Sequence, residues 1–333
     1  MLRRVVRSLV FLIVVLMTIA MVCGVALGES YTVRLVNNGT KVGDYGGLAD
    51  AINAAASLTN PTYLIGRSFD VTNPITMENA TLDLQNHTLT IKNNVTFSNV
   101  TIKDGSFNVS GNYSLMFENV KQQGWHTSGE NSGGVIKASD GARIVVKNST
   151  MQDNSAFEGA AIRAKDGVRL TVEGSSFVNN RCTNGGGAIL LWNATAEIRD
   201  STFNRNTASW TAGAIFSEYQ SDLKVYGTTF KNNKAGIRGG AVTVRRSHAV
   251  FLDFNGKPTL FENNEVQDCP DFGGGGLFID VGWVRMQDVL ITENSARDGG
   301  GGLSTCTTGT AQIGSLHGAA IYDSPAQTSF FRT

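Results

Sequence analysis

The chain has 333 residues, and its 28 lysines and arginines balance 28 aspartates and glutamates, which leaves a formal net charge of zero. Without a basic excess, nucleic acid is not predicted as a partner. Four cysteines in a chain of this length also exclude a small scaffold held together by disulfides. Nothing in the composition predicts a cofactor.

Residues 1–28 have the pattern of a secretion signal. Three arginines near the start are followed by an uncharged run from Leu9 to Val22 and by the small residues Ala26 and Gly28. This order of basic, apolar and small residues is typical of a signal peptide. We therefore expect a secreted or cell-surface protein with no membrane span apart from this segment. An uncleaved anchor is the alternative, because the apolar run approaches the length that spans a bilayer.

Residues 29–74 are expected to form an N-terminal cap. Apolar residues between Leu48 and Ala55 recur at helical spacing, which predicts a short amphipathic helix over residues 47–56. Asp44 precedes the helix and is an expected N-cap residue. Such a helix would close the open end of a stack of strands, which otherwise exposes unpaired backbone and core side chains.

Residues 75–303 carry a repeat. Its first part has short period-two fragments such as Leu82-Asp83-Leu84, separated by Asn, Gly and Asp, which predict strands and turns. Further on, blocks of small residues such as Gly186-Gly187-Ala188-Ile189 recur. The second small residue stands at 134, 160, 187, 213, 240, 276 and 302, at steps of 26, 27, 26, 27, 36 and 26 residues. A near-constant step of this size indicates a solenoid of stacked coils.

Two columns of residues recur in phase with these blocks. A phenylalanine is followed three residues later by asparagine four times. In parallel coils about 4.8 Å apart, equivalent residues superpose as ladders. We expect the phenylalanines to stack inside the coil and the asparagines to bond one another at a turn. The ladder residues are Phe177, Phe203, Phe230, Phe261, Asn180, Asn206, Asn233 and Asn264.

The pairing of Gly-Gly-Ala-Ile/Val with Phe-x-x-Asn resembles the repeat of the chlamydial polymorphic outer membrane proteins. The predicted helix and residues 82–89 are similar to the entry of the wider pectate-lyase-like superfamily. The resemblance covers roughly residues 31–310. It implies an all-β, right-handed parallel β-helix, here of about nine coils of about 26 residues. It also implies a non-enzymatic surface module used in adhesion or extracellular structure.

The end of the chain departs from that family. A C-terminal membrane barrel exports the β-helix there, whereas only about thirty residues follow Gly302 here, so no such barrel is expected. The period fails over residues 304–333, which predicts an irregular end or a truncated coil.

A carbohydrate-active enzyme, either a polysaccharide lyase or a glycoside hydrolase, is the alternative function. Hydrolysis needs carboxylates within several ångströms of one another, but Asp140 and Asp166 each precede a glycine, which is turn chemistry. The nearest approach to a lyase site is Arg245-Arg246 with Asp280, which one coil and an insertion separate. The histidines share no metal-binding spacing. The sequence therefore predicts no catalytic residue and no metal ligand.

A binding surface is predicted on the strands that follow the small-residue blocks. Several outward positions there are large and apolar, and exposed apolar patches often mark a partner. The partner would be an extracellular or cell-surface glycan or protein. The alternative is that loops or the C-terminal tail cover this row. The candidate residues are Leu190, Trp192, Phe216, Tyr219, Arg245 and Phe278.

Two smaller expectations concern modification. Nine Asn-x-Ser/Thr sequons predict a glycoprotein if the host glycosylates secreted proteins. Cys182 follows a ladder asparagine and is expected to be a surface thiol or to form one adventitious disulfide bridge.

Overall fold

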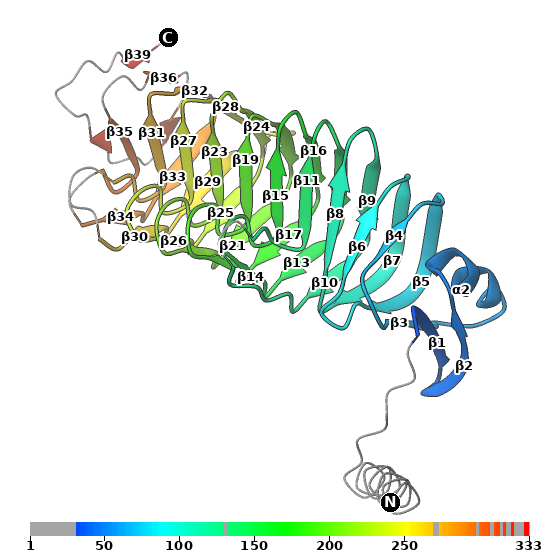
Figure 1. Cartoon of the computed structure of the whole chain (residues 1–333). Coiled ribbons are helices and arrows are strands. Elements are labelled where there is room, and N and C mark those ends of the chain that lie inside the picture. The colour runs from blue at the N-terminus through cyan, green and yellow to red at the C-terminus, as the bar shows by residue number, and fades with distance from the viewer. Residues whose placement is uncertain are drawn as a thin grey trace, which may run out of the picture.

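The computed structural model describes residues 31–129, 132–268, 273–297 and 300–306, and four short segments at 310–313, 316–317, 321–322 and 330–332. The expected signal segment lies outside the described residues. The chain winds into coils that stack in chain order, from the blue N-terminal hairpin and helix to the orange strands at the opposite end (Figure 1). Between the described strands, every pairing except those of β1 (Val33–Asn37) is parallel.

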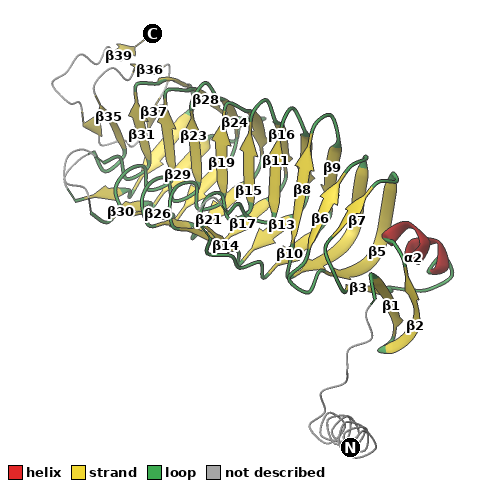
Figure 2. Ribbon diagram, in the orientation of Figure 1, coloured by secondary structure: helices red, strands yellow, loops and turns green. Residues whose placement is uncertain are grey.

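A regular coil contains four strands rather than the three expected. In one coil, β15 (Ile162–Lys165) is followed by β16 (Arg169–Glu173), β17 (Ser176–Val178) and the two-residue β18 (Arg181–Cys182). Equivalent strands of successive coils pair side by side and form four stacks (Figure 2). The sequence did not reveal the fourth strand, because two residues carry no periodicity.

The four stacks contain the following strands. The first stack is made of β4 (Phe69–Val71), β6 (Thr88–Ile91), β8 (Ser106–Ser110), β11 (Ile136–Ser139), β15, β19 (Ile189–Trp192), β23 (Ile215–Glu218), β27 (Val242–Arg245), β31 (Leu277–Asp280), β35 (Leu303–Cys306) and β38 (Ile321–Tyr322). The second is made of β9 (Ser114–Glu118), β12 (Arg143–Lys147), β16, β20 (Thr195–Arg199), β24 (Asp222–Tyr226), β28 (His248–Leu252), β32 (Trp283–Met286), β36 (Thr310–Ile313) and β39 (Phe330–Arg332). The third is made of β10 (Lys121–Gln123), β13 (Thr150–Gln152), β17, β21 (Thr202–Asn204), β25 (Thr229–Lys231), β29 (Thr259–Glu262), β33 (Val289–Thr292) and β37 (Leu316–His317). The fourth is made of β14 (Ser155–Ala156), β18, β22 (Thr207–Ala208), β26 (Lys234–Ala235), β30 (Glu265–Val266) and β34 (Ser295–Ala296). Near the N-terminus, β3 (Thr62–Ile65) precedes β5 (Ile75–Asp83) and β7 (Val95–Lys103), and these two long strands span the second and third stacks.

Coil length varies along the chain. The first stack has 11 strands, so there are more coils than the nine expected. The early coils are shorter than the repeat, since Phe69 pairs with Leu89 and Leu89 with Phe107. Across the insertion Val242 pairs with Leu277, so the long step is 35 residues, from 242 to 277, and not 36.

The repeat phenylalanines stack inside the coil. The ring centroids of Phe177, Phe203, Phe230 and Phe261 follow one another at 4.7, 5.1 and 4.8 Å, and all four rings are fully buried. One large ring per coil fills the interior and removes much apolar surface from water.

The ladder asparagines form one hydrogen-bonded column at a turn. The Nδ2 of Asn180 donates to the Oδ1 of Asn206 at 3.0 Å, and the same bond links Asn206 to Asn233 at 3.0 Å and Asn233 to Asn264 at 2.9 Å. Each Oδ1 also accepts the backbone N–H of the asparagine one coil earlier, as from Asn180 to Asn206. Asn154 extends the column by donating to the Oδ1 of Asn180 at 2.8 Å. Gln122 exchanges two side-chain hydrogen bonds of 2.8 Å with Asn154 and ends the column on that side.

The N-terminal cap contains a hairpin as well as the expected helix. β1 pairs antiparallel with β2 (Thr40–Tyr45), and helix α2 (Leu48–Ala54) follows. Asp44 is not the N-cap of this helix; that position is Gly47, and no side chain caps it. Asp44 lies in β2 and pairs with Arg34 at 2.7 Å and with Lys41 at 2.7 Å, and these bonds lower the pKa of Asp44 to about 2.

Parallel strands continue beyond residue 303. β35 pairs with β38, and β36 pairs with β39, so the described segments there are coil strands and not an irregular end.

Cys182 also differs from expectation. Its side chain is 1% exposed and burial raises the pKa of the thiol, so it is a core residue rather than a surface thiol.

Candidate binding surface

Loops cover much of the predicted binding row. Leu190, Phe216 and Phe278 occupy outward positions of the first stack, yet each is at most 2% exposed. The loops that lead from the fourth stack back to the first lie over them, and these loops pair with one another through Gly185, Thr211 and Arg238. These three apolar residues are therefore buried and are not part of an exposed surface. The sequence of a single coil does not reveal that a loop covers them.

The loops pass this close because their corner is glycine. Gly186 has φ +70°, and a Cβ there would lie 2.1 Å from the carbonyl oxygen of Ile189. Only a residue without a Cβ adopts this geometry at so short a distance. The glycines of the small-residue blocks thus allow these loops to pack closely against the outer face of the first stack.

Trp192 and Tyr219 remain at the surface, where the strands of the first stack end. Their ring centroids lie 5.3 Å apart at an interplanar angle of 22°, and Tyr219 is 43% exposed. The Nζ of Lys165 lies 5.3 Å from the centroid of the Trp192 ring, one coil earlier. This part of the predicted row forms a continuous aromatic edge across two coils.

Arg245, the last candidate of the row, is engaged by carboxylates. It pairs with Glu218 at 3.2 Å and with Asp280 at 3.4 Å, and Arg238 also reaches Asp280 at 3.4 Å. The two carboxylates are largely buried, and desolvation raises the pKa of Glu218. Arg245 therefore neutralises two largely buried acids and is not a free cation for a ligand.

The insertion does not separate Arg245 from Asp280, as the sequence had suggested. The two residues are direct partners in the β27–β31 register. Part of the extra length loops out near the antiparallel bridge between Phe254 and Lys257, at a corner of the coil. The pair is a structural ion pair of adjacent coils, because both partners are already bonded.

A hollow of about 420 Å³ lies next to the aromatic edge, at the corner between the first and second stacks. Such a volume falls in the range of roughly 300–1,000 Å³ that small-molecule sites occupy. The His248 and Trp283 rings lie 6.2 Å apart within it. The hollow is lined by Tyr219, Gln220, Arg246, Ser247, His248, Val281, Gly282 and Trp283. We call this hollow, together with Trp192, the aromatic corner.

The turn residues of the aromatic corner differ from those at the same position in earlier coils. Two earlier coils turn here with Asp-Gly, at Asp140-Gly141 and Asp166-Gly167, and all four residues have positive φ. Tyr219 and Gln220 take the same place with φ of +50° and +58°. A left-handed residue other than glycine costs of order 1 kcal/mol. The chain thus places an aromatic residue where Asp-Gly would be more stable.

Val281 adds a second exception. It has φ +52° and is 47% exposed, although a branched side chain strongly disfavours this conformation. Residues that a fold holds in strained conformations cluster at functional sites. Both exceptions lie in the lining of one hollow. Left-handed residues other than glycine also occur at many other turns, but Val281 is the one β-branched residue among them in the described part of the chain.

The sequence reasoning missed most of this lining. Trp283 does not share a phase with the other tryptophans and was no candidate. Arg246 was named only beside Arg245 in the rejected lyase site, and neither His248 nor Val281 was a binding candidate. The usable signal was the replacement of Asp-Gly by Tyr219-Gln220 at the same place in the repeat.

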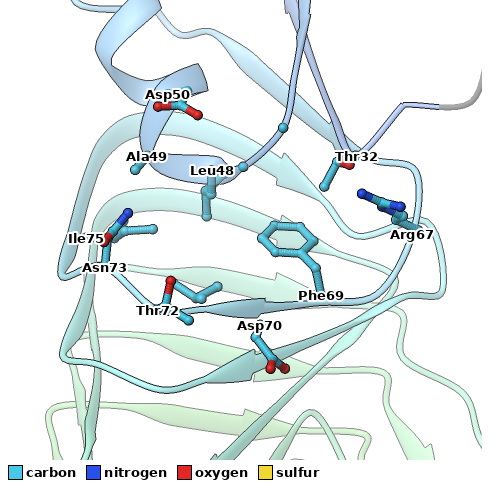
Figure 3. Close-up of a pocket in the computed structure, with 13 residues that line it drawn as sticks. Thr32, Leu48, Ala49, Asp50, Arg67, Phe69, Asp70, Thr72, Asn73 and Ile75 are labelled. Carbon is cyan, nitrogen blue, oxygen red and sulfur yellow. The ribbon is translucent and has the colours of Figure 1, made fainter.

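A second hollow, of about 260 Å³, lies between helix α2 and β4 (Figure 3). Leu48 from the helix and Phe69 from β4 face each other across it. Asp70, at its rim, pairs with Lys92 at 2.6 Å. We assign this hollow to the docking of the cap on the first coil, since Leu48 of the cap meets Phe69 of the coil across it, with polar residues such as Asp50 and Arg67 also in its lining.

The stacked parallel coils agree with a comparison to known families. A family model described as the right handed beta helix region matches residues 92–314. The chain belongs to the right-handed β-helix family. The match covers all the coils that build the aromatic corner of this β-helix. It bears out the fold that the resemblance implied, while the narrower chlamydial repeat type stays a prediction.

Other comparisons add little about this β-helix. A search of curated proteins finds no match. Among solved structures it is similar to the Dettilon tailspike protein (gp208), with 11% identity and a TM-score of 0.30 over 83% of this chain and 64% of that chain. The chain thus spans less than two thirds of the tailspike chain, and we build no argument on so distant a likeness.

Within residues that the structure places, no helix is both long enough and apolar enough to cross a bilayer. In the same part of the chain, no group of three or more His, Cys, Asp or Glu side chains is arranged to hold a metal ion.

Proposed function

We propose that this protein is a secreted or surface-displayed β-helix that binds an extracellular glycan at the aromatic corner without cleaving it. The observation that carries the proposal is the hollow between Tyr219 and Trp283, whose lining combines aromatic faces with amide, guanidinium and imidazole groups. Ligand sites typically combine apolar walls with a few polar groups that fix orientation.

The chemistry of the lining favours a sugar. The face of an aromatic ring carries a partial negative charge, because of the ring's quadrupole, and attracts the polarised C–H bonds of a pyranose. Gln220 offers a donor and an acceptor to hydroxyl groups beside the ring. Because the corner belongs to stacked coils, it is held rigidly before the ligand arrives, which lowers the entropy cost of binding.

Replacing Tyr219-Gln220 with Asp-Gly is expected to stabilise the protein and to weaken glycan binding. The double variant Tyr219→Asp/Gln220→Gly restores the turn residues of Asp166-Gly167, so the free energy of unfolding should rise by about 1–2 kcal/mol. Loss of a central aromatic contact should weaken binding by about thirtyfold. Thermal unfolding and a glycan array followed by titration calorimetry measure the two effects.

The control is Trp210→Ser, which removes another exposed aromatic residue, 38% exposed, outside the aromatic corner. It should leave binding unchanged. Equal loss of binding in the control and the double variant would contradict the site. Retention on cells that persists after enzymatic removal of surface glycans would point to a protein partner and overturn the glycan proposal.

The alternative of a carbohydrate-active enzyme makes a different prediction. Its best catalytic candidates, Glu218 and Asp280, are both paired with Arg245. We expect no new reducing ends and no unsaturated ends after incubation with acidic and neutral polysaccharides. Turnover that disappears in Glu218→Gln or Asp280→Asn would replace the binding proposal by the enzymatic one.

A further inference from the structure

Glu158 holds a lysine and an asparagine at the two oxygens of one carboxylate. The Nζ of Lys165 lies 3.2 Å from Oε2, and the Nδ2 of Asn184 donates to Oε1 at 3.1 Å. Glu158 and Asn184 belong to covering loops of adjacent coils, since the Asn184 N–H donates to the Phe157 carbonyl. Lys165 is the last residue of β15. The fold thus gathers an amine, a carboxylate and a carboxamide from three parts of the chain.

The cluster is largely shielded from solvent. The side chain of Glu158 is 13% exposed and that of Lys165 is 20% exposed. Arg163 also reaches Oε2 of Glu158, at 3.0 Å, and the Lys165 amine lies 5.3 Å from the centroid of the Trp192 ring. These contacts hold the carboxylate and the amine in place beside each other. Exclusion of water also protects such a site from hydrolysis as a competing reaction.

The arrangement contains more than a structural ion pair needs. Asp153 offers the comparison, because it accepts from Asn179 at 3.1 Å and from Gln152 at 3.0 Å, and no amine is paired with it among the residues that the structure describes. At Glu158 the amide and the amine share the carboxylate. A lysine amine is a nucleophile once a neighbouring base takes its proton. Holding the reacting groups together in a rigid site greatly raises their effective concentration.

We propose that Lys165 and Asn184 form an intramolecular isopeptide bond with Glu158 as the proton carrier, a modification that is independent of glycan binding. The Lys165 Nζ passes a proton to Oε2 of Glu158, and its freed electron pair attacks Cγ of Asn184. The Cγ–Nδ2 bond then breaks, and the nitrogen leaves with the protons that the lysine ammonium gave up. One ammonium and one carboxamide become one secondary amide and a free ammonium ion. The Glu158 carboxylate is regenerated, and no oxidant or other reactant is consumed.

The bond ties a covering loop to the end of a strand in the first stack. It closes a loop over residues 165–184 and joins adjacent coils covalently. A cross-link of this kind stabilises a protein mainly by restricting the unfolded chain. The covering loops are thereby held over the first stack without a disulfide.

Mass spectrometry of the denatured full chain tests the proposal. The reaction expels ammonia, so the chain should be about 17 Da lighter than an unlinked chain with the same ends. Trypsin does not cleave after an acylated lysine. After digestion, residues 164–169 should therefore appear joined to residues 182–199.

Three variants assign the roles. Lys165→Arg and Glu158→Gln should each have the unlinked mass and lack the joined peptides. Lys165→Arg keeps a cation beside Glu158, so it removes the nucleophile while retaining the ion pair that supports the fold. The matched control is Asn179→Ala, which removes the amide beside Asp153 and should keep the bond.

Cleavage after Lys165 in the unmodified protein, with no loss of mass, overturns the proposal. So does a loss of mass that persists in Lys165→Arg, because a succinimide at Asn184-Gly185 also expels ammonia but forms no cross-link. Joined peptides that survive in Glu158→Gln overturn the assignment of Glu158 as the proton carrier.

Discussion

Replacing Asn206 with alanine is expected to lower the free energy of unfolding by about 4 kcal/mol. The side chain accepts the backbone N–H and the amide of Asn180, and it donates to the Phe177 carbonyl and to Asn233. Alanine leaves the buried Asn180 N–H without the acceptor it has here, at about 1–3 kcal/mol, removes a bond to the Phe177 carbonyl and breaks the ladder on both sides. Denaturant unfolding followed by circular dichroism measures the loss.

Two further variants separate the causes. Asn204→Ala removes an amide two residues away that accepts one bond from Asn232 at 3.0 Å, and it should cost less than about 1 kcal/mol. Asn206→Asp keeps the shape of the side chain but sets an oxygen against the Phe177 carbonyl, so it should be at least as damaging as alanine. Equal losses for Asn206→Ala and Asn204→Ala would show that the ladder bonds carry no special weight.

Gly213→Val is the second change with a large expected effect, of about 4 kcal/mol or complete failure to fold. A Cβ at this position would lie 2.2 Å from the Gly240 carbonyl oxygen and 2.6 Å from the backbone of Lys234. These contacts are backbone atoms of the next coil, which no side-chain rotation relieves. The soluble yield and the unfolding midpoint of the purified variant measure the effect.

Gly129→Val is the matched control, because a Cβ on the exposed Gly129 would have no atom within 4 Å. It should change the midpoint only slightly. Ala160 stands in the same row, but at Gly213 even a Cβ would come too close to the Gly240 carbonyl oxygen. A Gly213→Val protein as stable as the unmodified one would contradict the close approach of the loops to the next coil.

The coil and its two ladders were predictable because each depends on residues that repeat. A phenylalanine in every coil has the same neighbours above and below, so the period alone places Phe203 between Phe177 and Phe230. The asparagine ladder followed for the same reason. The period of 26 to 27 residues also predicts which residues of adjacent coils pair in parallel, as Ile162 does with Ile189 and Ile189 with Ile215.

The parts that failed are those in which residues from different coils meet. Burial of Leu190 and Phe216 depends on a loop that folds back over the sheet, and nothing in the alternation of one strand reports that loop. Arg245 was chosen as an exposed cation, but Glu218 and Asp280 on the two adjacent coils neutralise it. Asp44 had the right place for a helix cap, yet Arg34 on the neighbouring strand holds it in the hairpin.

The asparagine ladder also sets the unit in which this molecule can change its length. The amide of each coil completes the turn of the coil before it, as Asn206 does for the turn at Phe177. A deletion or insertion of one whole coil leaves the next amide in register, whereas any other length removes the partner of a buried turn. Whole coils added before Trp192 would carry the aromatic corner farther from the N-terminal end without altering it. The length of the solenoid and the residues of the aromatic corner can therefore change independently.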